Sequence, residues 1–291
     1  MYDLANSVDD YFEASARYWE KIYEEKDLTA TLYQERQRVT LDLINSLALS
    51  SDACILDVGC GAGTTAVALA QLGFTAVALD RVPAMLERTR ARAEKAGVSH
   101  LLRPVAGDAY ALDFADRSFD VVMALGVIPW LSSPAVAVRE MIRVTKPTGH
   151  LILSADNRWR LNRVLDPIDN PMIAPLRCRI ASVFRKHGPG KGVNANTHSP
   201  HELDNFLRSV GLRKLRGVGV GFGPFTFLRA RLLPGRTEIR LHQWLQRKAE
   251  NGLEVLGKLG AHYVVLAKAA AGADKYASAP AGKAGVKVDY Q

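Results

Sequence analysis

The sequence predicts an α/β fold with a doubly wound, mostly parallel sheet, and two observations carry this prediction. Between residues 53 and 155, short apolar runs typical of buried strands alternate with amphipathic runs typical of helices. A glycine-rich turn, Gly59-Cys60-Gly61-Ala62-Gly63, joins the first predicted strand to the helix that follows it. Alternation of this kind is typical of a parallel sheet with helices on both faces.

The elements of the first half follow from hydrophobic periodicity. Two amphipathic helices, residues 8–26 and 31–49, precede the sheet. The predicted strands are residues 54–58, 75–79, 101–106, 119–125 and 150–155, and the helices between them begin near Thr64 or span residues 83–96 and 135–144. A turn at residues 146–149 precedes the fifth strand.

The second half is less regular. Residues 156–198 read as a basic insertion, with one amphipathic helix that carries Ile173, Leu176, Ile180, Val183 and Phe184. A capping box, Ser199-Pro200-His201-Glu202, opens a helix that runs to Val210. Strands at 212–220 and 262–268 complete the sheet, the last one antiparallel, and residues 222–251 form a second insertion, basic and aromatic, with a helix over 236–251.

The chain thus divides into a helical cap (residues 1–49), a catalytic domain (50–268) with both insertions, and a tail (269–291) that we expect to be disordered.

Composition excludes several classes of protein. The 291 residues are 48% hydrophobic and 23% charged, which is typical of a soluble globular chain. Three cysteines, Cys54, Cys60 and Cys178, show no spacing of a disulfide framework or a zinc site. The acidic N-terminus lacks the features of a signal peptide. We therefore expect a cytoplasmic protein.

The net charge of +8 is unevenly distributed. Residues 158–248 contain 18 lysines and arginines against 5 acidic residues, whereas residues 1–157 contain 15 against 21. The basic stretch is either a solvated face or a surface that attracts an anionic partner.

The glycine turn predicts a cofactor site. A dinucleotide fingerprint requires a third glycine where Thr64 stands, so an NAD site is not predicted. Asp80 ends the second strand, where a carboxylate of a doubly wound fold accepts hydrogen bonds from ribose hydroxyls, and Asp108 follows the third strand. These acids favour a different ribose-containing cofactor.

At this point the sequence resembles the class I S-adenosylmethionine-dependent methyltransferases, in the branch related to ubiquinone-biosynthesis O-methyltransferases. The resemblance rests on LDVGCGAG (residues 56–63), on Asp80, on Asp108-Ala109, on FDVV (119–122), on REMIRVTKPTGHLILS (139–154) and on SADNRW (154–159). It covers residues 50–155 well, and 199–220 and 261–268 more loosely. It implies a Rossmann-like fold and S-adenosylmethionine as the cofactor.

The resemblance also assigns roles to residues. It implies that Gly59, Cys60 and Gly61 form the loop at the methionine portion of the cofactor, with Asp57 near its ammonium group. It implies that Asp80 binds the ribose, that Asp108 and Ala109 contact the adenine, and that Arg81 flanks the adenosine and Leu125 lies beside the cofactor.

The methyl acceptor is less determined. Methyl transfer needs the nucleophile held against the methyl group in a dry site, and an alcohol or phenol benefits from a general base. His198 is the first candidate for this base, with His187, His201 and His242 behind it; a surface loop is the alternative for His198. Asp156 either binds substrate or caps a turn.

No metal is predicted, because residues 123–130 after the fourth strand lack the second carboxylate that a hard cation would need beside Asp156-Asn157. The same stretch lacks the motif of enzymes that methylate nucleobase amines.

Aromatic residues of the N-terminal helices either roof the active site or pack into the core: Tyr11, Tyr18, Trp19, Tyr23 and Tyr33. Both insertions interleave apolar and cationic residues, including Phe225, Phe227, Leu228 and Trp244 with Arg229, Arg231, Arg236 and Arg240. Such a mixture suits an anionic amphiphile, a peripheral membrane surface or RNA.

Three functions follow from the sequence. The first is O-methylation of a small or lipid-like, possibly anionic, biosynthetic intermediate, by a protein at the inner membrane surface or free of it. The second is methylation of RNA, which is less favoured because no RNA-binding module is recognisable. The third is a non-catalytic protein that binds S-adenosylmethionine as a regulator or scaffold.

Overall fold

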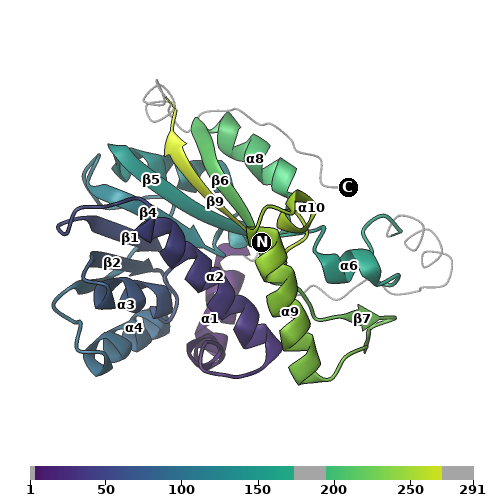
Figure 1. The fold of residues 1–291 in the computed structure, drawn as a ribbon. Helices are drawn as coiled ribbons and strands as arrows, with labels where there is room; N and C mark the ends of the chain where they lie inside the picture. The colour runs from purple at the N-terminus through teal and green to yellow at the C-terminus, as the bar shows by residue number, and fades with distance from the viewer. Residues whose placement is uncertain (1–3, 174–194, 271–291) are drawn as a thin grey trace.

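The computed structural model describes residues 4–173 and 195–270. Its centre is a seven-stranded sheet with the strand order β3-β2-β1-β4-β5-β9-β6 (Figure 1). The strands are β1 (Cys54–Val58), β2 (Thr75–Asp80), β3 (Leu102–Ala106), β4 (Phe119–Leu125), β5 (Thr145–Asp156), β6 (Leu212–Val220) and β9 (His262–Ala269). The first five strands pair in parallel, and β9 is antiparallel to β5 and to β6. The predicted doubly wound sheet, with its last strand antiparallel, is confirmed.

Helices lie on both faces of this sheet (Figure 1). The longer ones are α1 (Leu4–Lys21), α2 (Leu28–Asn45), α3 (Thr64–Gln71), α4 (Pro83–Lys95), α5 (Pro134–Val144), α8 (Pro200–Ser209) and α9 (Gly235–Glu250). The short elements are η1 (Ile128–Trp130), α6 (Leu161–Leu165), α10 (Glu254–Gly257) and the hairpin of β7 (Thr226–Phe227) with β8 (Ala230–Arg231).

The core sits on the two faces of the sheet, because successive side chains of a strand point to opposite faces. Leu56 and Val122 pack with Met141 of α5 and its neighbours on one face. Ile55 and Val121 pack with α2 and α3 on the other. Apolar side chains on both faces explain why these strands read as continuous hydrophobic runs.

The N-terminal helices lie a few residues earlier than periodicity predicted, at Leu4–Lys21 and Leu28–Asn45 rather than 8–26 and 31–49. The cause is Asp27, whose side chain accepts a hydrogen bond from the Ala30 N–H at 2.7 Å and so fixes the start of α2. The capping box of Ser199 and Glu202 is confirmed at the start of α8.

The predicted turn at residues 146–149 was wrong, because β5 already begins at Thr145. Thr145 pairs with Phe119, and the register then shifts before Val121 pairs with His150. Lys146 Nζ contacts both carboxylate oxygens of Asp120 at 2.9 Å, which ties the irregular start of β5 to β4.

Most of the predicted amphipathic helix in the first insertion lies outside the described residues, as does nearly all of the predicted tail. The described part of that insertion contains α6, and the second insertion contains the β7–β8 hairpin and α9. Among the described helices, none is both long and apolar enough to cross a membrane.

The strand order places a switch between β1 and β4. From β1 the chain proceeds to β2 and β3 on one side, and from β4 to β5 on the other. Ligands of open α/β sheets bind beyond the carboxyl ends of the strands at such a switch, and the residues predicted to bind the cofactor follow these strand ends.

Candidate active site

The glycine turn after β1 is held by the end of β2. The Gly59 and Cys60 N–H groups donate to the Leu79 carbonyl at 2.7 and 3.0 Å, and the Gly61 N–H donates to Asp80 Oδ2 at 2.8 Å. Gly59 and Gly61 have φ of +68° and +56°, which side chains rarely adopt. A Cβ on Gly61 would meet no atom within 4 Å, so the turn presents bare backbone to open space at Gly61, whereas a Cβ on Gly59 would lie 2.6 Å from the Val127 side chain.

Two buried carboxylates flank this turn. Asp57 is 3% exposed, and no group of the described residues donates a hydrogen bond to it. Burial, and then the neighbouring charge of Asp80, raise the pKa of Asp57 to about 8. Burial also raises the pKa of Asp80, although the N–H groups of Val82 and Gly61 donate to its carboxylate. A positively charged ligand would stabilise the ionised forms of Asp57 and Asp80 and so lower the pKa of both.

The turn after β3 supplies the next side of the site. Asp108 Oδ1 accepts the Tyr110 N–H at 2.9 Å, which fixes a tight turn through Ala109. Arg81 reaches across with Nη2 3.0 Å from Asp9 on α1 and Nη1 3.8 Å from Asp108. Arg81, which follows β2, therefore connects α1 to the turns after β2 and β3.

The end of β4 supplies the side that faces β5. Leu125 is the last residue of β4, and the Gly126 N–H donates to Ser154 Oγ on β5 at 2.8 Å. Gly126 has φ of +75°, and a Cβ there would lie 2.7 Å from Arg36 Nη1. The backbone at the end of β4 thus passes close to the guanidinium of Arg36.

These elements enclose a cavity of about 470 Å³. All nine residues predicted to bind the cofactor line it: Asp57, Gly59, Cys60, Gly61, Asp80, Arg81, Asp108, Ala109 and Leu125. Burial raises the pKa of the Cys60 thiol, so this side chain is a small neutral wall of the turn. The positions chosen from sequence therefore converge on one place.

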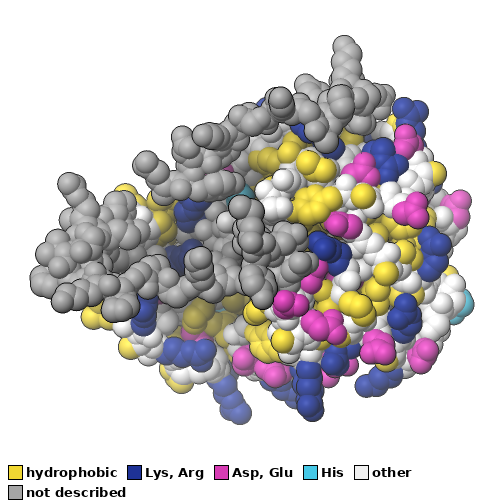
Figure 2. All heavy atoms as spheres, turned by 180° about the vertical axis from the view of Figure 1, so that it is seen from behind, with side chains coloured by type: hydrophobic (Ala, Val, Ile, Leu, Met, Phe, Trp, Pro, Cys, Tyr) yellow, Lys and Arg dark blue, Asp and Glu magenta, His cyan; other side chains and the backbone are white. Residues whose placement is uncertain are grey.

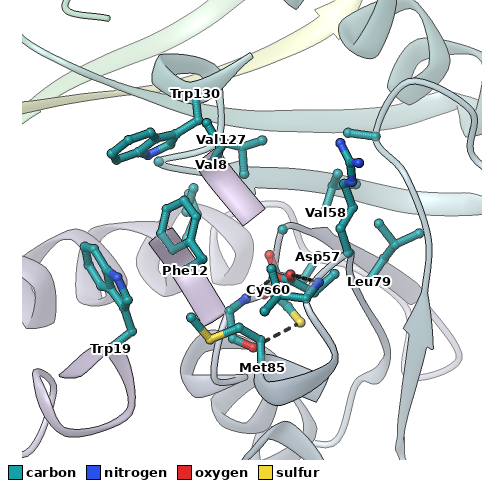
Figure 3. A pocket seen from close by; sticks show the side chains of 18 of the residues that line it. Val8, Phe12, Trp19, Asp57, Val58, Cys60, Leu79, Met85, Val127 and Trp130 are labelled. Carbon is teal, nitrogen blue, oxygen red and sulfur yellow. Dashed lines mark hydrogen bonds between the residues drawn. The ribbon is translucent and has the colours of Figure 1, made fainter. Parts of the chain in front are cut away.

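Aromatic side chains of the N-terminal helices cover this cavity. Phe12, Trp19 and Trp130 lie along one side of it, opposite Val58 and Leu79 (Figure 3). Their rings touch in series: Phe12 contacts Trp130 and Trp19, and Trp19 contacts Tyr33, with centroids 5.1, 5.9 and 5.6 Å apart. Of the five aromatic residues considered from sequence, Trp19, Tyr23 and Tyr33 line the cavity, whereas Tyr11 and Tyr18 do not.

Arg36 was not predicted from the sequence. It is 7% exposed, and no carboxylate of the described residues forms an ion pair with it. Its closest polar contact is with Tyr23 Oη at 3.3 Å, and its guanidinium lies 4.9 Å from the centre of the Tyr33 ring. The available signal was periodicity, because Arg36 shares a helix face with Leu32 and Val39, where a buried apolar residue is expected.

An acid of the cavity, Asp156, meets a histidine of the neighbouring strand. Asp156, the last residue of β5, lines the cavity. It is the register partner of His262, the first residue of β9, and His262 Nδ1 lies 3.1 Å from Asp156 Oδ1. His262 was missed because it reads as part of a strand, and only the pairing of β9 with β5 shows what it faces.

The predicted base His198 is near this pair but is not one of the cavity residues. Its backbone N–H donates to the Asp156 carbonyl at 2.9 Å, its Nδ1 is buried without a partner, and burial lowers its pKa. His201 is exposed on α8, and His242 Nδ1 accepts the Phe222 N–H in a buried contact. His187 lies outside the described residues. Within the described ranges, no three His, Cys, Asp or Glu side chains form a group that could hold a metal ion.

Comparison with known proteins identifies the central part of the chain. Residues 56–153 match the family model of a methyltransferase domain. The ubiquinone biosynthesis O-methyltransferase of Pseudomonas paraeruginosa is 29% identical over 216 residues, which cover 74% of this chain and 86% of that protein. The protein of the same name from Pseudomonas fluorescens is 28% identical over the same shares of the two chains.

Solved structures share the fold. Magnesium protoporphyrin IX methyltransferase from Synechocystis, with bound SAH, has a TM-score of 0.59 at 17% identity over 91% of this chain and 99% of its own. The cyclase SpnF also has a TM-score of 0.59, at 19% identity over 90% and 95%. The same architecture therefore occurs in proteins named for different reactions.

Proposed function

We propose that this chain, which belongs to the S-adenosylmethionine-dependent methyltransferases, transfers the methyl group to a hydroxyl oxygen of a small or lipid-like biosynthetic intermediate. The observation that carries the proposal is the single cavity in which the predicted cofactor residues meet an aromatic wall and Asp156. S-adenosylmethionine is a sulfonium, and it supplies a methyl group that is displaced in line by a nucleophile.

The charges in the cavity fit this cofactor. Asp57 is a buried carboxylate without a hydrogen-bond donor, which suits the ammonium group of the methionine portion. Arg36 is a buried guanidinium without an acidic partner, which suits its carboxylate. We thus assign the ammonium group of the methionine portion to Asp57 and its carboxylate to Arg36, two buried groups of opposite charge type in the cavity.

The remaining cofactor residues follow the strand ends. We assign the bare backbone of Gly59, Cys60 and Gly61 to the methionine portion, and Asp80 to the ribose hydroxyls. Asp108 and Ala109 are assigned to the adenine, with Arg81 against the adenosine. Leu125 is assigned to the boundary between cofactor and acceptor, because β4 ends between the glycine turn and β5.

The rest of the cavity supports an aromatic or otherwise apolar acceptor that carries a hydroxyl group. Phe12, Trp19 and Trp130 offer ring faces, against which a flat apolar molecule packs favourably. Asp156 accepts a hydrogen bond, and hydroxyl groups donate one. Such an acceptor is in keeping with the names of the curated relatives.

We further propose that the protein meets a lipid surface. Exposed apolar side chains on the β7–β8 hairpin, including Phe227 and Leu228, and Trp244 on α9 lie among arginines of the same segments. On the uncovered part of the face that Figure 2 shows, lysines and arginines are mixed with aspartates and glutamates. A basic and apolar region on one side suits an anionic membrane. RNA methylation remains the alternative that the basic residues favour.

The test is an acceptor screen with S-adenosylmethionine labelled in its methyl group, against lipid, quinone-precursor, glycan and RNA fractions. We expect label in lipophilic molecules that carry a phenol or an alcohol. Label in RNA alone would replace the proposal with the alternative. Tight cofactor binding with no labelled product in any fraction would favour a regulatory or scaffolding protein.

A further inference from the structure

The Asp156–His262 pair is built by the fold rather than by a flexible loop. The two residues are direct partners in the antiparallel ladder of β5 and β9, and their side chains meet at 3.1 Å. The side chain of Asp156, which lines the cavity, is 32% exposed, whereas that of His262, which is not among the lining residues, is 10% exposed. The carboxylate is therefore fixed on one side and open toward the space for an acceptor.

The protonation states of the pair follow from its surroundings. Burial lowers the pKa of His262 against the pull of Asp156, so the imidazole is neutral and carries one N–H. The pKa of Asp156 is lowered too: burial alone would raise it, but the contact with His262 and the charges of Arg36 and Arg160 outweigh burial. An ionised carboxylate only accepts, so the Nδ1–H of His262 donates to Asp156 Oδ1.

The other titratable groups near Asp156 and His262 are less suited to accept a proton. Tyr33 has its ring 5.4 Å from that of His262, but burial raises the pKa of Tyr33 to about 12, which keeps its hydroxyl neutral. His198 contacts the pair through its backbone, and burial lowers the pKa of its imidazole. The charged and titratable groups around Asp156 are thus Arg36 and Tyr33 from α2, Arg160, His198 and His262.

We propose that Asp156 accepts the proton of the acceptor's hydroxyl group during methyl transfer, and that His262 is a positioning residue that holds the Asp156 carboxylate toward the acceptor. This inference rests on the proposed function, of which it specifies the base. The hydroxyl donates a hydrogen bond to the free oxygen of Asp156.

The electrons and atoms balance without a further reactant. The acceptor oxygen forms its bond to the methyl carbon while the carbon–sulfur bond breaks and leaves its electron pair on sulfur. The O–H bond breaks, and the proton moves to Asp156 and then to water. A carboxylate with a lowered pKa is a sufficient base, because an oxygen that is gaining a methyl group becomes strongly acidic.

Three variants of the full-length protein test the proposal: Asp156→Asn, His262→Asn and the control His150→Asn. His150 lies on the same strand as Asp156, near its other end, and outside the cavity. Calorimetry with S-adenosylhomocysteine comes first, and we expect near-equal affinity in all four proteins. Failure of the wild-type protein to bind it would count against the proposed function itself, whereas the comparisons below concern only the base.

The first comparison needs no turnover. We follow the imidazole nitrogen signals of His262 by NMR across a pH titration of the cofactor-free protein. Asp156→Asn should shift these signals and lower the pKa of His262 further, because the carboxylate that favours the imidazolium is gone. His150→Asn should leave them in place. If the imidazole nitrogen signals of His262 are the same in Asp156→Asn as in the wild-type protein, Asp156 and His262 are not in contact.

The second comparison uses two probe acceptors, catechol and 4-nitrocatechol, which is far more acidic. For Asp156→Asn we expect kcat with catechol to fall about 100-fold, and to rise about tenfold per pH unit as catechol ionises on its own. With 4-nitrocatechol at a pH where it is already ionised, the loss should stay below about fivefold, since no proton remains to be accepted. His262→Asn should show the same pattern more weakly.

Equal losses with both probes in Asp156→Asn would make Asp156 a structural or binding residue and overturn the proposal. A pattern of this kind in His198→Asn, with none in His262→Asn, would move the base to His198. A wild-type protein that binds the cofactor but methylates neither probe nor any alcohol of the acceptor screen would also overturn it.

Discussion

Asp57 is a buried carboxyl group to which no group of the described residues donates a hydrogen bond. Its pKa is raised from 3.8 to about 8, so between these pH values the folded protein binds a proton that the unfolded chain does not. The burial of this carboxyl group therefore lowers the free energy of unfolding, and the loss grows as the pH rises toward 8, because the unfolded chain releases the proton that the folded protein keeps. A ligand that brings positive charge to Asp57 should recover this free energy as affinity.

Asp57→Asn should accordingly stabilise the cofactor-free protein, by on the order of 2 kcal/mol at pH 7, and weaken cofactor binding. Thermal unfolding between pH 5 and 8 should show the gap from wild type widening as pH rises. The exposed carboxylate Asp113 provides the control Asp113→Asn, which should change neither quantity. A less stable Asp57→Asn variant with full affinity would contradict this account.

Asp80 has a different role, because two backbone N–H groups already donate to its carboxylate. Asp80→Ala should lower cofactor affinity by about 100-fold or more, since it removes both the proposed ribose contact and the support of the glycine turn. The unfolding free energy should fall by about 1–3 kcal/mol, while circular dichroism still reports the α/β fold. Calorimetry that finds unchanged cofactor affinity would remove Asp80 from the site.

At the scale of elements, α1 acts as a wall of the cavity rather than as a separate cap. It contributes Phe12 and Trp19 to the aromatic side, and Asp9 to Arg81. Its contacts with α4 include the ion pair of Glu20 with Arg88, and Glu24, three residues beyond the end of α1, pairs with Arg92. The position of α1 therefore bears on the acceptor space and on the cofactor space together.

Phe12→Ala should raise the KM for the acceptor about tenfold, because it removes the ring that joins Trp130 to Trp19. Cofactor affinity should change much less, since the residues assigned to the cofactor keep their contacts. Tyr18→Ala serves as the control, because Tyr18 lies on the same helix but is half exposed and outside the cavity. Steady-state kinetics with an acceptor from the screen would measure these KM values. Equal effects of Phe12→Ala and Tyr18→Ala on KM would show that Phe12 does not contact the acceptor.

The elements also show what the sequence could and could not predict. β1, β4 and β6 occupy the predicted residues. For β1 and β4 the reason is that mostly apolar runs mark buried parallel strands. The start of β5 was missed because pairing with β4, and not local composition, sets it. Arg36 and His262 were missed for the same reason: each occupies a position whose periodicity predicts an apolar core residue, and only tertiary contacts show the polar group it faces.

For the whole molecule, the cofactor half of the site was predictable and the acceptor half was not. The residues assigned to the cofactor lie at the ends of four strands that are consecutive in the chain, β1 to β4, so one topology brings them together. The acceptor side combines α1, α2, β5 and β9, which are distant in sequence. No local sequence pattern predicts that these four elements meet.

The distribution of charge makes a prediction for the molecule as a whole. The protein should sediment with vesicles that contain phosphatidylglycerol and be released as ionic strength rises, because screening weakens its attraction to the anionic surface. Leu228→Ser with Trp244→Ser should weaken binding by removing exposed apolar contacts, while Val136→Ser, at an exposed apolar position on α5, should not. Vesicles that fail to sediment the wild-type protein at low salt would count against a lipid surface.

The pairing of β5 with β9 has a practical consequence for redesign. Asp156 and His262 sit opposite each other at the last rung of that ladder, remote in the chain from the glycine turn. The proposed base and its positioning residue are therefore encoded apart from the glycine turn that is assigned to the donor. We expect that replacing these two residues would favour acceptors whose nucleophile is already ionised and therefore needs no base.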